Sequence, residues 1–237
     1  MMTISAVKPE AKDLPEKGAV LQRDRKTYAL VPHIPGGIIL DPNLLRKIAD
    51  VAEKYNAKAM KLTSAQRIAI VGIRPEDIDQ AWEDLGEDKG AAIGLCVRSI
   101  KICPATHFCK RAQQDAVTIG LELDKTYHAM KLPSKFKIGI SGCMNSCSEV
   151  AVKDMGFMGT PKGFTVLIGG NAGIRPRIGN VLIEHIKPEE VLPLAEKIVE
   201  YYKANARNYE RMGMMIDRLG FEKVKKEILG LEASPQA

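Results

Sequence analysis

Four of the five cysteines in the 237-residue chain fall into two pairs that could hold a metal centre. Cys103 and Cys109 delimit "CPATHFC", and Cys143 and Cys147 lie in "GCMNSC". Four thiolates from two loops can bind a [4Fe–4S] cluster or a structural zinc ion. Five intervening residues are long for a zinc knuckle, which favours iron–sulfur, with four buried free thiols as the remaining alternative. Cys96, in the apolar run "AAIGLCVR", is expected to be a packed core thiol.

Basic residues close to these cysteines could bind a small anion. The segment "KFK" precedes the second pair, and in a strand Lys135 and Lys137 share one face while Phe136 points to the other. Arginine can make bidentate contacts with oxyanion oxygens, and lysine offers a compact charge that can also donate a proton. Arg67 and Arg98 are the other candidates. The alternative is that the two lysines belong to a solvated strand edge.

The two cysteine segments resemble the iron–sulfur and siroheme signature of the sulfite and nitrite reductase family. In that family the second pair reads G-C-x-N-x-C, as Gly142 to Cys147 do here. "KLTSAQRIAIVGI" resembles the family's strand with a substrate-facing arginine, and "VRSIKICP" places Arg98 five residues before the first ligand. "LPSKFKIGISGC" resembles the segment whose two lysines point at the bound anion, and "FTVLIGGNAGIRPRIG" resembles a glycine–asparagine turn after the cluster. The resemblance covers most of residues 27–185.

This resemblance implies siroheme and a [4Fe–4S] cluster as cofactors. It makes Cys103, Cys109, Cys143 and Cys147 the cluster ligands, and it gives Cys147 a second role as axial thiolate of the siroheme iron. A shared sulfur would leave an electron almost no distance to travel between the two centres. The implied catalytic residues, which would face the substrate, are Arg67, Arg98, Lys135 and Lys137. The implied cofactor-binding residues are Cys147, Asn145, Gly142, Asn171, Arg175 and Arg177, the two arginines as partners of the eight siroheme carboxylates.

The elements that must position these residues form an α+β fold in three sections. Residues 1–26 are polar and contain prolines, so we expect a flexible arm. Residues 27–88 have a ββαββα pattern, with "GGIIL" as the second strand, and the resemblance makes them a ferredoxin-like half-domain. Residues 89–237 would be the α+β domain that binds siroheme and the [4Fe–4S] cluster. We expect it to begin with an apolar connector, to contain strands such as "KFKIGI", and to end in helices.

The chain departs from the large members of the family in two respects. They have two related halves, each with a ferredoxin-like and a cluster-type lobe, whereas this chain has room for one copy of each. In this it resembles the small assimilatory-type sulfite reductases. In the large sulfite reductases the arginine precedes the strand's glutamine, whereas here Ala65 precedes Gln66 and Arg67 follows it, as on the nitrite-reductase side of the family. We therefore expect Arg67 to be the equivalent group.

Composition and charge narrow the function classes. A 45% hydrophobic and 27% charged chain is typical of soluble globular proteins, and no apolar run could span a bilayer. The start, "MMTISAVKPEAKDLPEKG", lacks the apolar core of a signal peptide, so we expect a cytoplasmic protein without membrane contact. The net charge of +6 favours an acidic partner or a small anion. Only 5% aromatic residues and no recognisable motif argue against nucleic acid.

These features together predict an enzyme that reduces sulfite to sulfide with six electrons. The electrons would come from an external acidic carrier such as a ferredoxin, because no flavin or nicotinamide motif is visible. The same site could reduce nitrite to ammonia. A second hypothesis is a non-catalytic electron-transfer protein that keeps the cluster, which would give no reason for the four basic residues. A third is a zinc-stabilised module that binds nucleic acid.

Overall fold

The computed structural model describes residues 11–231, which divide into two compact units. Of the described residues, the first unit contains 11–33 and 39–93, and the second contains 34–38 and 94–231. Each unit has its own cluster of buried apolar side chains. The division after residue 93 lies a few residues beyond the expected boundary at residue 88. Among the helices of residues 11–231, none has both the length and the apolar character needed to cross a membrane.

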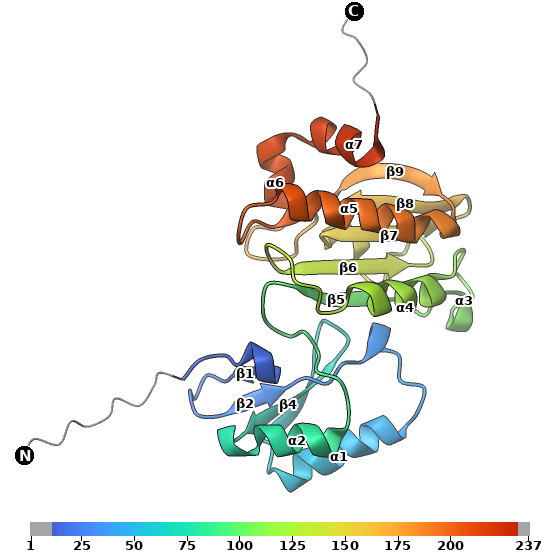
Figure 1. The fold of residues 1–237 in the computed structure, drawn as a ribbon. Coiled ribbons are helices and arrows are strands. Elements are labelled where there is room, and N and C mark those ends of the chain that lie inside the picture. Colours follow the sequence, from blue (N-terminus) through green and yellow to red (C-terminus); the bar gives the residue numbers. More distant parts are fainter. Residues whose placement is uncertain (1–10, 232–237) are drawn as a thin grey trace, which may run out of the picture. The chain divides into compact units, whose positions relative to one another are not determined.

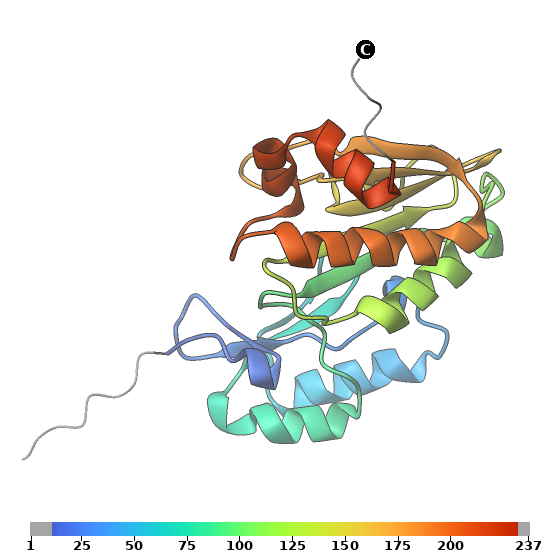
Figure 2. The same cartoon turned by 45° about the horizontal axis from the view of Figure 1, so that its top comes forward.

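The first unit is a four-stranded antiparallel sheet with two helices. Its strands are β1 (Ala19–Leu21), β2 (Tyr28–Leu30), β3 (Ala59–Leu62) and β4 (Ile68–Ile73), in the order β1-β2-β4-β3. Helices α1 (Asn43–Lys54) and α2 (Ile78–Leu85) pack against each other and lie side by side in Figure 2. Two 3₁₀ turns, η1 (Pro15–Lys17) and η3 (Pro75–Asp77), lie in this unit. The apolar stripes of both helices close over β4, which is the usual way an amphipathic helix is stabilised.

Two expectations for the N-terminal part are corrected by the structure. Strand β1 lies within residues 1–26, which we expected to be a flexible arm, and it pairs with β2 from Ala19 opposite Leu30 onward. Residues 1–10 lie outside the described residues. "GGIIL" forms no strand, because Pro35–Gly37 is a 3₁₀ turn, η2, in the second unit. The φ angles of Gly36 and Gly37 are +60° and +68°, which interrupt an extended chain.

The second unit is a five-stranded mixed sheet. Its strands are β5 (Val97–Ile102), β6 (Phe136–Ser141), β7 (Met155–Thr160), β8 (Gly163–Ile168) and β9 (Asn180–Ile186), and they neighbour one another in that order. Strands β5, β6 and β7 are parallel, whereas β8 and β9 add antiparallel. Helices α4 (Ala116–Tyr127) and α5 (Val191–Asn205) lie along one face of the sheet (Figure 1).

Shorter elements complete this unit. They are the helices α3 (Ala105–Phe108), α6 (Met212–Leu219) and α7 (Phe221–Leu229) and the 3₁₀ turns η4 (Val150–Val152) and η5 (Pro188–Glu190). Helix α3 follows β5 directly, and η4 lies in the segment that joins β6 to β7. The elements that carry the cysteines are therefore short and depend on the sheet for their position.

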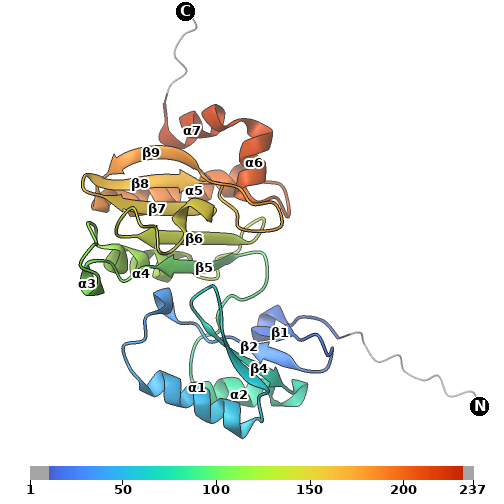
Figure 3. The ribbon, with the colours of Figure 1, turned by 180° about the vertical axis from the view of Figure 1, so that it is seen from behind.

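Side-chain alternation gives β5 and β6 one apolar and one polar face. Ile102, Phe136 and Ile140 are buried in the core with α4 and α5, where the Phe136 and Tyr202 ring centroids lie 5.2 Å apart. Lys101 alternates with the isoleucines of β5 and belongs to the opposite face, the side seen in Figure 3.

Candidate metal centre and active site

The two cysteine pairs meet because β5 and β6 are parallel neighbours. Cys103 directly follows β5, and Cys143 is the second residue after β6, so both pairs begin at the same end of the sheet. The backbone N–H of Gly142 donates a hydrogen bond to the Sγ atom of Cys103 at 3.1 Å. This contact joins the first residue of one pair to the residue before the other pair.

Gly142 is the point at which the two cysteine loops pack together. Its carbonyl oxygen accepts hydrogen bonds from the backbone N–H groups of Gln113 and Gln114, at 2.7 and 3.0 Å. A Cβ atom on Gly142 would lie 2.6 Å from the carbonyl oxygen of Gln114, closer than real Cβ contacts. Gly159 of β7 faces the same point, because a Cβ there would lie 2.5 Å from the Gly142 carbonyl carbon. Both positions therefore require glycine for close backbone approach.

A tight turn arranges the second pair. The Ser146 N–H donates to the Cys143 carbonyl oxygen at 3.2 Å, and the φ angle of Ser146 is +53°. Ser148, which follows Cys147, is fully buried and anchors this turn to β6, since its Oγ donates to the Ile140 carbonyl oxygen at 2.8 Å. Cys147 is thereby held beside the end of β6. The side chains of Cys147 and Asn145 are both exposed.

The cysteines suit the cluster that their spacing predicts. Cys103, Cys109, Cys143 and Cys147 are all free thiols, and the loops that carry them start at one end of two adjacent strands. Four thiols are the complete ligand set of a [4Fe–4S] cluster. Cys96 is buried before β5 and outside this group, as expected for a core thiol.

The unit that contains the cysteines also contains a cluster of five cations. We call it the basic cluster, and its members are Arg98, Lys101, Lys137, Lys153 and Arg211. The ammonium of Lys137 forms no ion pair with a carboxylate anywhere in residues 11–231. Burial lowers the pKa of Lys137 from its usual 10.5, and the nearby charges of Lys153, Arg211 and Arg98 lower it further. This lysine carries a charge that the fold itself does not neutralise.

Two members of the basic cluster share one carboxylate. The side chains of Lys101 and Lys153 are only 9% and 4% exposed, and both form ion pairs with Glu149, at 3.1 and 2.9 Å. The Lys153 side chain crosses β6 above Gly139, where a Cβ atom would lie 2.9 Å from its Cγ. Hydrogen bonding from Lys153 is the main cause that lowers the pKa of Glu149. Glu149 stands two residues after Cys147, so these ion pairs fix the segment that leaves the second cysteine pair.

Asp154 connects Lys137 to the C-terminal part of the unit. Its fully buried carboxylate accepts the Lys137 backbone N–H at 2.8 Å and two hydrogen bonds from Arg211, at 2.8 and 2.6 Å. Arg211 also donates to Oδ1 of Asn171 at 3.2 Å. Burial raises the pKa of Asp154, and the Arg211 guanidinium opposes that rise. The Asn171 turn and the start of β6 are therefore joined through one buried ion pair.

The site is strongly electropositive. Lys101 and Lys153 share the carboxylate of Glu149, Arg211 pairs with Asp154, and Lys137 has no ion pair within residues 11–231, so these four cations outnumber their two carboxylates by two. A buried excess of one sign destabilises a fold unless counter-charges bind. The arrangement is therefore suited to anionic ligands.

The structure brings some predicted site residues together and separates others. Arg98 and Lys137 lie at the amino ends of β5 and β6, whereas the cysteines follow the carboxyl ends of the same strands. The segment from Cys147 to Asp154 joins the two groups. Lys135 is exposed immediately before β6.

Arg67 belongs to the first unit, immediately before β4, and is only 7% exposed. A Cβ atom on Gly90 would lie 2.9 Å from its Nη1 atom, so glycine there leaves room for the guanidinium.

The predicted cofactor-binding turn is held largely by its own contacts. Asn171 Nδ2 donates to the carbonyl oxygen of Arg175, whose side chain is exposed. The Arg177 guanidinium donates to Asp217, to Asn180 and to the Gly169 carbonyl oxygen. Arg177 thus has a structural role in this turn, whereas the Arg175 side chain is open to solvent.

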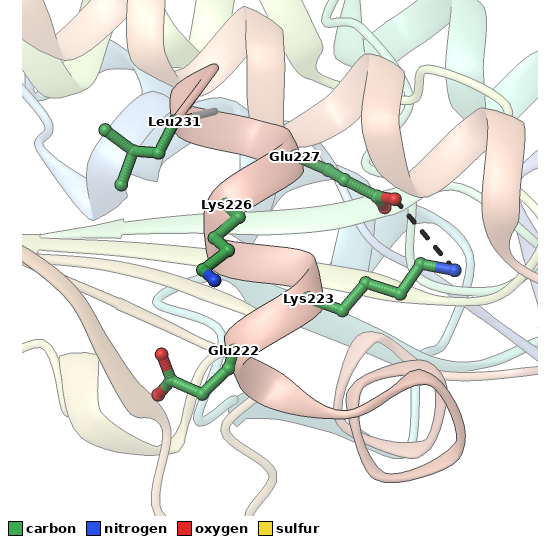
Figure 4. A pocket seen from close by; sticks show the side chains of 5 residues that line it. All are labelled: Glu222, Lys223, Lys226, Glu227 and Leu231. Atoms are coloured by element: carbon green, nitrogen blue, oxygen red, sulfur yellow. Dashed lines mark ion pairs between the residues drawn. The ribbon is translucent and has the colours of Figure 1, made fainter. Parts of the chain in front are cut away.

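A shallow hollow on α7 carries no comparable chemistry. It is lined by Glu222, Lys223, Lys226, Glu227 and Leu231, and Lys223 pairs with Glu227 at 3.9 Å (Figure 4). None of the predicted site residues reaches it.

Sequence reasoning missed Lys101, Lys153, Asp154 and Arg211. Alternation along β5 could have identified Lys101, because it lies between the core residues Ile100 and Ile102 and two residues before Cys103. Arg211 is 57 residues from the carboxylate it binds, and no local pattern marks that pairing.

Comparison with known proteins assigns both units. Residues 93–235 match the family described as the nitrite and sulphite reductase 4Fe-4S domain, and residues 20–88 match the nitrite/sulfite reductase ferredoxin-like half domain. The assimilatory-type sulfite reductase of Nitratidesulfovibrio vulgaris is 40% identical over 214 residues, which is 90% of this chain and 98% of that protein. The nitrite reductase [NAD(P)H] of Bacillus subtilis is 36% identical over 207 residues, 87% of this chain but only 26% of that protein.

Solved structures share the fold. Dissimilatory sulfite reductase I superposes with a TM-score of 0.78 at 19% identity, covering 88% of this chain and 70% of that one. The Mycobacterium tuberculosis NirA protein superposes with a TM-score of 0.73 at 18% identity, covering 86% of this chain and 40% of that one. The predicted α+β architecture, with a ferredoxin-like half-domain first, is confirmed.

Proposed function

Because this chain belongs to the nitrite and sulphite reductase family, we propose that it is a siroheme-dependent assimilatory-type sulfite reductase. It reduces sulfite to sulfide with six electrons, and the substrate oxygens leave as water. The electrons come one at a time from an external acidic carrier such as a ferredoxin. Thiolate ligands stay reduced in the cytoplasm, which is where we place the reaction.

The cysteines hold the inorganic centre in this proposal. Cys103, Cys109, Cys143 and Cys147 would hold the [4Fe–4S] cluster, and Cys147 would also be the protein ligand of siroheme. Siroheme, when bound, supplies the iron at which sulfite is reduced. Gly142 permits the close packing of the two ligand loops on which the cluster depends.

The basic residues bind the anions and supply protons. Arg98 and Lys137 hold substrate oxygens, with Lys135 as a further contact, and the lysine ammonium groups donate protons to the leaving oxygens. The substrate-facing role of Arg67 stays a prediction from the resemblance. The remaining cations of the basic cluster, together with Asn171 and Arg175, are available to the siroheme carboxylates. A preformed set of donors stabilises developing charge without reorganisation.

One observation carries this proposal. Four free thiols follow the ends of β5 and β6, and Lys101, Lys137, Lys153 and Arg211 in the same unit outnumber their two carboxylate partners by two. An electron-transfer protein would need the thiols but not the uncompensated cations. A zinc-stabilised module would need neither Lys137 nor a buried Asp154 beside it.

Nitrite is the second candidate substrate. The order of Gln66 and Arg67 resembles the nitrite-reductase side of the family, and the Bacillus subtilis nitrite reductase is 36% identical over the shared region. Nitrite is also a small oxyanion, so the same cations serve it.

The test begins with protein purified without oxygen. We expect siroheme absorption bands and about five iron atoms per chain, about four of them with acid-labile sulfide. Sulfite and nitrite are then compared as oxidants of reduced methyl viologen, and their kcat/KM values rank the substrates. A brown protein without siroheme bands or turnover, after reconstitution with siroheme, would demote the chain to an electron carrier. A colourless zinc protein would exclude the whole proposal.

A further inference from the structure

Two large apolar side chains stand exposed on the cysteine loops. Phe108, directly before Cys109, is 67% exposed, and Met144, directly after Cys143, is 62% exposed. The hydrogen bonds of Gly142 hold these loops against each other, so both side chains belong to one end of the sheet. Exposed apolar side chains gathered at one place commonly mark an interaction surface.

Free cations accompany this apolar pair. Lys110 and Arg111 follow Cys109, and Lys162 lies in the turn between β7 and β8. That turn is held to the first cysteine loop, because Gln114 Nε2 donates to the Thr160 carbonyl oxygen at 2.8 Å. Lys110, Arg111 and Lys162 are all exposed, and none forms an ion pair within residues 11–231.

The neighbouring acid does not neutralise these charges. Asp115 accepts hydrogen bonds from the backbone N–H groups of Val117 and Thr118 and caps α4, and it lies 3.4 Å from His107. This end of the sheet therefore presents an apolar centre with a positively charged rim.

We propose that Phe108, Lys110, Arg111, Met144 and Lys162 form the docking surface for an acidic one-electron carrier protein. The inference rests on the proposed function, since it requires a cluster at the cysteines beside this surface. The reduced carrier loses one electron and the cluster gains it, with no bond made or broken. Docking at the ligand loops shortens the path into the cluster.

Charge selects this occupant over a second copy of the chain. The chain carries a net charge of +6, so two such positively charged ends would repel each other. An acidic protein is attracted, and a small apolar centre within a charged rim is typical of transient protein–protein contacts.

The first experiment reverses the rim charges in the holoprotein. In Lys110→Glu/Arg111→Glu we expect the Kd for an acidic [2Fe–2S] ferredoxin, measured by isothermal titration, to rise about tenfold at low salt. The salt dependence of that Kd should become shallower, because fewer charges attract the partner. Turnover with the small reductant methyl viologen should not change.

A matched control separates local charge from net charge. Lys223→Glu/Lys226→Glu makes the same change in net charge on α7, which lies near β9 at the opposite edge of the sheet from β5 (Figure 1). It should leave the ferredoxin Kd within twofold of wild type. Phe108→Ser/Met144→Ser should weaken binding while keeping the wild-type salt dependence.

Three results would overturn the inference. They are an unchanged Kd in both surface variants, an equal effect of the α7 control, and loss of siroheme absorption in Phe108→Ser/Met144→Ser. The last would assign the apolar pair to the cofactor. If ferredoxin binds as expected but wild-type protein with viologen reduces neither anion, the proposed function fails and the docking surface stands.

Discussion

Lys137 shows how a single charge can identify a site. Its side chain is half-buried and surrounded by like charges, and the nearby carboxylate of Asp154 is already engaged by Arg211. The sequence indicated Lys137 through the "KFK" pattern and the resemblance that follows it. It gave no sign of Asp154, Lys153 or Arg211, because pairings between side chains far apart in sequence depend on the folded chain.

We therefore expect Lys137→Met to separate activity from stability. Removing a buried charge without an ion-pair partner should raise the free energy of unfolding of the apoprotein by about 1 kcal/mol. Loss of the substrate contact should lower viologen-driven turnover about 100-fold or more. Urea denaturation and steady-state kinetics measure the two effects.

The control is Lys125→Met, an exposed lysine on α4. It should change neither quantity. A destabilised Lys137→Met apoprotein would mean that the ammonium has a favourable partner, contrary to its surroundings as described.

Among the elements, the parallel pair β5–β6 is the most important for the site. "KFKIGI" was recognisable as a strand, and the helices after Pro188 were recognisable by their apolar spacing. Strand β5 was not predicted, because the small and apolar residues that lead into it indicated a connector. Strand β7 was missed because "MGFMGT" has two glycines and no alternation, although Gly156 and Gly159 are required by close backbone neighbours. Such requirements arise only after the chain has folded.

Helix α6 offers a pH-dependent test at this scale. Glu210 is buried, and its carboxylate accepts two hydrogen bonds from Arg218 at 2.7 Å, one to each oxygen. Arg218 lowers the pKa of Glu210 from 4.5 to about 2. A carboxyl group with a lowered folded-state pKa stabilises the protein above its unfolded pKa, and this contribution is lost as the pH falls from about 4.5 toward 2.

We expect Glu210→Gln to lower the free energy of unfolding by about 2 kcal/mol at pH 7. The difference from wild type should shrink steadily below pH 4.5, since protonated wild-type Glu210 resembles the glutamine. Urea titrations at pH 7, 4 and 3 measure it, with the exposed Glu222→Gln on α7 as control. A difference that stays constant with pH would contradict the assigned cause.

For the whole molecule, the important feature is two separate apolar cores. One core contains residues between 19 and 85, and the other belongs to the second unit, with all of its buried members at 97 or later. The sequence indicated this division through its ββαββα section and the later cysteines. It placed the start of the first unit too late, because β1 is only three residues long and short strands give little periodic signal.

Removal of iron should consequently lower the unfolding temperature of the second unit only. Calorimetry of the holoprotein should resolve two transitions, and chelation of iron should lower one of them by roughly 5–10 °C while the other is unchanged. Cys103→Ser should reproduce the chelated profile, whereas Cys96→Ala should keep its iron. A single transition that moves as a whole would show that the two cores unfold together.

The length of strand β6 sets the separation between a basic residue and a cysteine loop. The strand has Lys137 near one end and Cys143 beyond the other, and its six residues span about 17 Å at the usual rise per residue. Inserting one residue after Ile138 would turn the lysine and the cysteines to opposite faces, while inserting two would restore the face and lengthen the strand. The spacing between Lys137 and Cys143 is thus set in whole residues, so evolution or engineering can change it only in discrete steps.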